Sequence, residues 1–200
     1  MKPSSLAAAL AASVPLLFAA PAGQAAVFVY EATLSGQNED PPNASPGTGW
    51  AIVTYDDTAM TMRVEAEFSG LLGDVTTAHI HCCTAAPVAG NAGVATTTPT
   101  FPGFPAGVTS GSYDTTFDLT LASSFNPSFV TANGGSLASA TAALFAGMED
   151  GKAYFNIHSS AYGAGEIRGF LLPASVPEPG SLALLGLGAA ALAIRARRRN

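Results

Sequence analysis

The 200-residue chain is 48% hydrophobic and carries 14 acidic and 8 basic residues, a formal net charge of −6. Five of the basic residues lie close to the two ends of the chain. Residues 26–175 therefore keep three basic residues against thirteen acidic ones, a net charge of −10. A nucleic-acid-binding domain needs a basic surface, so this charge excludes nucleic acid as a partner. The remaining length is about that of one domain with its own hydrophobic core.

The first 25 residues have the pattern of a secretory signal peptide. Lys2 precedes an apolar, alanine-rich stretch at 6–20, and the small residues Gly23 and Ala25 suit the positions before a cleavage site. We predict a signal peptide at 1–25, cleavage after Ala25 with Ala26 as the alternative position, and export by the secretion machinery.

Residues 26–175 are predicted to form one mainly β domain. Residues 60–68 alternate between apolar and polar side chains, which is typical of a half-buried antiparallel strand. The Ala-rich stretch 136–148 predicts one short helix, and 84–110, rich in Gly, Pro and Thr, predicts a long loop. The expected architecture is an antiparallel sandwich or open barrel, with strands at 27–35, 48–55, 60–68, 75–81, 112–121, 153–158 and 166–172.

All three histidines of the chain fall on two of these strands. His79 and His81 are two residues apart, so their side chains share one face of a strand. His158 lies on the non-core side of the other strand by the same alternation. Imidazole is a good ligand for copper, zinc, iron and nickel. We predict His79, His81 and His158 as metal ligands, with copper or another transition metal as the cofactor. The alternative is that these imidazoles only bind loop backbone.

The two cysteines, Cys82 and Cys83, are adjacent and directly follow the histidine pair. Export would place them in oxidising surroundings without a distant partner. Four states stay open: free thiols, a vicinal disulfide, metal ligands, or an intermolecular disulfide. Strand alternation points Cys82 away from the histidines, so a cysteine reaches a metal there only if the loop turns it back.

Short motifs are spread over the domain: Leu34–Glu39 with Pro41 and Pro42, Gly49–Ala51, Phe68–Leu71, Ala78–His81, Gly151–His158 and Gly165–Gly169. Together they resemble the CHRD domain, a family widespread in exported bacterial proteins. The resemblance implies an immunoglobulin-like β-sandwich or barrel and leaves the activity open. One departure is Cys82-Cys83, where small residues are expected after His-Ile-His. The order of His79, His81 and His158 is also similar to the copper-binding histidines of copper–zinc superoxide dismutases, without a bridging histidine.

The C-terminal tail, 176–200, combines a Pro-Glu-Pro turn, an apolar run at 181–194 and four terminal arginines. The run would span roughly 21 Å as a helix, which predicts a short transmembrane segment with the arginines on the cytoplasmic side. The tail resembles the PEP-CTERM sorting signal, whose motif here is Pro177, Glu178 and Pro179. The resemblance implies an exosortase as partner, transient anchoring in the membrane, and a destination at the cell surface or outside the cell.

Two hypotheses of function follow. No Ser-His-Asp arrangement, phosphate-binding loop or zinc-protease motif is present, so hydrolysis is not expected. The first hypothesis is a non-catalytic binding or structural module of the cell surface or matrix, with extracellular polysaccharide or matrix as partner. The second is a copper-type metal-binding protein that uses the three histidines and has a redox role open to it.

Overall fold

A computed structural model describes residues 26–174; the signal peptide, the sorting motif Pro177, Glu178 and Pro179, and the segment 181–194 lie outside these residues. The described residues form one eight-stranded sheet in the order β4-β6-β7-β1-β2-β3-β5, with β8 paired to β1. Every pairing between strands is antiparallel. The strands are β1 (Val27–Ser35), β2 (Thr48–Asp56), β3 (Thr61–Ser69), β4 (Val75–His81), β5 (Gly111–Asp118), β6 (Tyr154–Ser159), β7 (Ile167–Phe170) and β8 (Leu172–Pro173).

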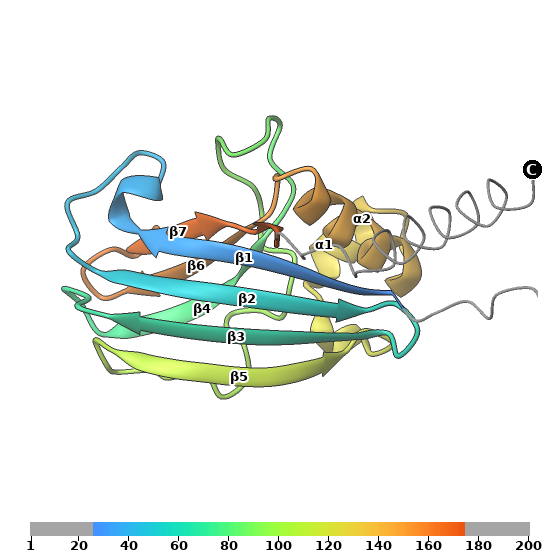
Figure 1. Cartoon of the computed structure of the whole chain (residues 1–200), viewed down its shortest axis with the longest axis horizontal. Helices are drawn as coiled ribbons and strands as arrows, with labels where there is room; N and C mark the ends of the chain where they lie inside the picture. Colours follow the sequence, from blue (N-terminus) through green and yellow to red (C-terminus); the bar gives the residue numbers. More distant parts are fainter. Residues whose placement is uncertain (1–25, 175–200) are drawn as a thin grey trace, which may run out of the picture.

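The sheet curls into a half-barrel. In Figure 1, β1, β2, β3 and β5 lie in front, and β7, β6 and β4 continue the sheet behind them. The predicted mainly β, antiparallel fold is thereby confirmed. The predicted strands 27–35 and 75–81 have the observed bounds, whereas the predicted strand 166–172 is divided into β7 and β8.

Alternate residues of the strands fill the inside of the curl. In β3, Met62, Val64, Ala66 and Phe68 are buried, and the residues between them point outward. The loop between β4 and β5 has no helix or strand of its own, as predicted, but it contributes Phe101 to the same core. The Phe101 ring lies 5.2 Å from that of Phe117 and 5.9 Å from that of Phe155. The loop is therefore anchored by the hydrophobic core.

Two helices, α1 (Pro127–Ala132) and α2 (Leu137–Glu149), lie together at one end of the sheet (Figure 1). Helix α2 begins after Ser136, whose hydroxyl accepts a hydrogen bond from the backbone of Ser139 in a capping box. The six residues of α1 were not predicted as a helix. Two 3-10 turns, η1 (Gly36–Asn38) and η2 (Ala122–Ser124), complete the elements. Among the described residues, no helix has the length and apolar character needed to cross a membrane.

Candidate metal centre

The register of β4 and β6 brings all three histidines together. His79 pairs with Asn156 and His81 with Tyr154, so His158 is the diagonal neighbour of His79 on the same face. The Nε2 atoms of His79 and His158 are 3.0 Å apart. One ligand nitrogen from each ring lies within 4.8 Å of the other two. The two-residue spacing on two neighbouring strands thus produces one compact cluster of imidazoles.

Backbone carbonyls fix the orientation of each ring. The Nδ1 atoms of His79, His81 and His158 lie 2.9, 2.8 and 3.0 Å from the carbonyl oxygens of Pro99, Ala92 and Gly163. Each Nδ1–H donates to its carbonyl, which leaves Nε2 of each neutral ring with a free lone pair. Metal-binding histidines are commonly oriented by such a second hydrogen bond.

The Nε2 atoms, which face the centre of the histidine cluster, have no hydrogen-bond donor from the described residues. Nε2 of His81 is buried without a hydrogen-bond partner among the described residues. In the neutral rings, the Nε2 atoms of His79 and His158 are two acceptors facing one another. A buried acceptor without a partner costs about 1–3 kcal/mol. A transition-metal ion would satisfy these lone pairs, so the donor set fits such an ion.

Burial keeps the three rings neutral. It lowers the pKa of His79 to about 4, with a smaller lowering from His158 and an opposing effect of the Pro99 carbonyl. Burial and the neighbouring His79 lower the pKa of His81 to about 3. The pKa of His158 is also lowered, again chiefly by burial. Because metal ligation requires neutral imidazole, the cluster is prepared for an ion at neutral pH.

The face that carries the histidines is covered by other parts of the chain. Tyr154 and Asn156, which the alternation assigns to the non-core side, are each 2% exposed. The Tyr154 ring stacks on that of His81 with centroids 4.7 Å apart, and the guanidinium carbon of Arg168 lies 4.6 Å from the Tyr154 ring centroid. The non-core side of β6 is therefore a second buried layer, although strand alternation alone predicts it to face away from the core.

A buried ion pair borders this layer. Nε of Arg168 lies 3.9 Å from Oε2 of Glu39, and its Nη1 donates to Oδ1 of Asn91 at 2.7 Å. Burial raises the pKa of Glu39 to about 7, although Arg168 and Asn156 act in the opposite direction. Oε1 of Glu39 and Oδ1 of Asn156 are buried and have no hydrogen-bond partner within residues 26–174. No local sequence pattern links Glu39 to the histidines.

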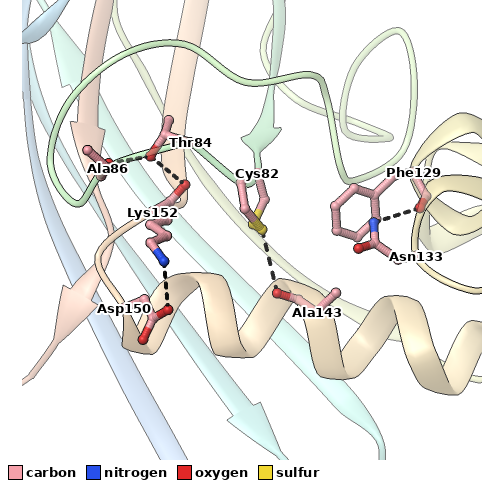
Figure 2. The surroundings of a disulfide bond; sticks show 9 residues. Cys82, Thr84, Ala86, Phe129, Asn133, Ala143, Asp150 and Lys152 are labelled. Atoms are coloured by element: carbon pink, nitrogen blue, oxygen red, sulfur yellow. Dashed lines mark hydrogen bonds and ion pairs between the residues drawn. A yellow bond between two sulfur atoms is a disulfide. The ribbon is translucent and has the colours of Figure 1, made fainter.

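The two cysteines form a vicinal disulfide. Figure 2 shows this bond beside α2, where Sγ of Cys83 lies 3.6 Å from the carbonyl oxygen of Ala143. Of the four states left open by the sequence, the structure has the vicinal disulfide, which removes the thiolates as metal ligands. Gly147 of α2 faces the bond, and a Cβ there would lie only 2.3 Å from Sγ of Cys82.

Comparisons with curated proteins and with solved structures find no significant match. Residues 175–199 match the PEP-CTERM protein-sorting motif. The protein is therefore exported, anchored transiently in the membrane, and processed by an exosortase before its release at the surface. Residues 30–171, from the buried Tyr30 of β1 to the residue after β7, match the CHRD domain model, and the chain belongs to the CHRD domain family.

Proposed function

We propose that the domain acts outside the cell as a binding module, and that its ligand is one transition-metal ion held by His79, His81 and His158. The observation that carries the proposal is the arrangement of the three Nε2 atoms. Each Nδ1 donates to a carbonyl, two Nε2 atoms face one another at 3.0 Å, and the third is buried without a partner in the described part of the chain. A purely structural cluster would gain stability by giving these nitrogens donors.

The nature of the donors favours copper. The cluster offers imidazole nitrogen only, because the adjacent cysteines are joined to each other. Calcium and magnesium bind chiefly to oxygen. Among divalent ions on a nitrogen site, copper(II) generally binds more tightly than zinc or nickel. The proposal assigns binding to this cluster and no catalytic turnover.

The test is metal stoichiometry of the exported protein purified without a polyhistidine tag. After chelation, the protein is loaded with copper(II) or zinc(II), dialysed, and analysed by mass spectrometry of the metal. We expect about one ion per chain, tighter retention of copper, and a rise in the unfolding temperature on loading. His81→Ala should abolish all three effects.

The matched control addresses the acidic surface, which attracts cations without a specific site. Asp74→Asn removes an exposed carboxylate that directly precedes β4, five residues before His79, but is not part of the histidine cluster, and it should leave the stoichiometry unchanged. Sub-stoichiometric metal that is equally reduced in His81→Ala and Asp74→Asn would contradict the proposal. Circular dichroism of each variant verifies that the sheet has formed.

A further inference from the structure

A groove with a volume of about 1040 Å³ lies over the outer side of β1 and β2. Its walls come from these strands, from the segment around η1, from 88–90, and from β7 and β8. Lining residues include Glu31, Asn38, Asp40, Trp50, Phe170 and Leu172. None of the three histidines lines this groove. It is thus a second candidate site, independent of the metal centre.

Trp50 is the main aromatic contact that the groove offers. It stands on β2 between Thr33 of β1 and Glu67 of β3, and 40% of it is exposed. A smaller hollow, lined by Glu67 and Ser69 of β3, also includes Trp50 in its wall. A Trp ring presents a flat apolar face with a negative electrostatic potential, which suits C–H groups and cations. Because Trp50 borders both hollows, this surface suits an extended ligand better than a small one.

Most polar side chains that line the groove offer hydrogen-bond acceptors. Glu31 and Asp40 form no ion pair among residues 26–174. The amide groups of Gln37 and Asn38 donate to the backbone carbonyls of Asn43 and Thr33, which leaves their side-chain oxygens to accept. A complementary ligand therefore carries donors, as hydroxyl and ammonium groups do.

The basic residues of the domain do not neutralise this surface. Arg63 pairs with Asp114 and Glu65, and Lys152 pairs with Asp150. Arg168 lines the groove but is 2% exposed and lies beside Glu39. The groove therefore favours a positively charged ligand and disfavours an acidic polymer.

We propose that this groove binds a polysaccharide that bears free amines, such as a polymer of glucosamine units. Trp50 stacks against the apolar face of a sugar ring. Glu31 and Asp40 pair with its ammonium groups, and the amide oxygens accept from its hydroxyls. The inference goes beyond the metal centre and gives the matrix polysaccharide expected from the sequence a place and a chemical class.

The test is calorimetric titration of the metal-free protein with a glucosamine hexamer at about pH 6. We expect saturable binding that weakens on the order of tenfold in Trp50→Ala. Glu31→Gln should weaken it by a smaller factor and reduce its salt dependence. Leu121→Ala, which removes an apolar side chain with 52% exposure away from the groove, and Asp74→Asn are the matched controls.

Two comparison ligands distinguish binding of an amine-bearing sugar from binding of any sugar and from binding of any cation. A fully N-acetylated hexamer should bind at least about tenfold more weakly, because its nitrogens are neutral. A lysine-rich peptide should bind without dependence on Trp50. Equal binding of both hexamers, Trp50-dependent binding of the peptide, or no saturable binding of the glucosamine hexamer would overturn the proposal. His81→Ala should not alter sugar binding. The sugar-binding proposal can therefore fail while the metal-binding proposal stands, and the metal-binding proposal can fail while the sugar-binding proposal stands.

Discussion

The non-core side of the sheet differs between its two halves. On β4, β6 and β7 it holds His79, Tyr154 and Arg168, which are at most 6% exposed. On β2, β3 and β5 it holds Trp50, Arg63 and Asp114, which are open to solvent. Both halves follow the same strand alternation, so alternation sets only the direction of a side chain. Whether that direction leads to water depends on the loops that cover it.

The largest expected effect comes from truncating Phe101, which anchors the loop between β4 and β5 in the hydrophobic core. Phe101 is fully buried, and its backbone N–H donates to the carbonyl of Ala78 on β4. Phe101→Ala should lower the free energy of unfolding by about 3–5 kcal/mol, measured by urea denaturation. It should also weaken metal binding, because Pro99, two residues earlier, orients His79.

The matched substitution is Trp50→Ala, on the half of the sheet formed by β2, β3 and β5, whose non-core side is open to solvent; we call it the open half. It removes a larger ring that is partly exposed, so the free energy of unfolding should change by less than about 1 kcal/mol. Equal losses in the two variants would mean that the loop contributes no more to the core than an exposed side chain does.

An effect smaller than that of Phe101→Ala is expected where α2 contacts the disulfide. Gly147→Ala places a methyl group against both sulfur atoms and should cost about 1–3 kcal/mol of unfolding free energy. In a background with Cys82→Ala and Cys83→Ala, the same substitution should cost much less. A double-mutant cycle measured by thermal unfolding tests this coupling. Additive costs would show that the glycine is required for another reason.

The buried Glu39 predicts a pH dependence of stability. Its pKa is about 7 in the folded protein, against an ordinary value of 4.5, so the folded state holds the proton more tightly than the unfolded state. Its contribution to stability is therefore fully present below about pH 4.5 and is lost as the pH rises through about 7.

Glu39→Gln isolates this contribution. From about pH 5 to about pH 8, the native protein should lose on the order of 1–2 kcal/mol of unfolding free energy relative to Glu39→Gln. Denaturation at several pH values measures the difference, which cancels the contribution of the histidines. A difference that does not change with pH would mean that Glu39 ionises normally beside Arg168.

These features differ in how far the sequence predicts them. Alternation within β3 identifies its core side, and the pair His79 and His81 is visible because the two are neighbours on one strand. The meeting with His158 requires the register of β4 and β6, which no local pattern encodes. The cover over Tyr154 is harder still to predict, because Arg168 lies over its ring and is held by Glu39 and Asn91, which come from loops far away in the chain. Long-range packing, and not local propensity, decides which polar side chains become buried.

The smallest effect is expected at the exposed ion pair of the open half. Nη2 of Arg63 lies 2.7 Å from Oδ2 of Asp114 and 3.0 Å from Oε1 of Glu65, and water reaches all three side chains. The hydrogen bond with Asp114 raises the pKa of Arg63, but solvent and salt screen the attraction. Arg63→Ala should therefore leave the urea midpoint unchanged at physiological ionic strength. Arg168→Ala should shift it clearly, because that guanidinium bonds to Asn91 and lies over Tyr154 in the covered layer. Similar shifts of the urea midpoint for the two arginine variants would mean that burial by the loops does not increase the contribution of a polar side chain to stability.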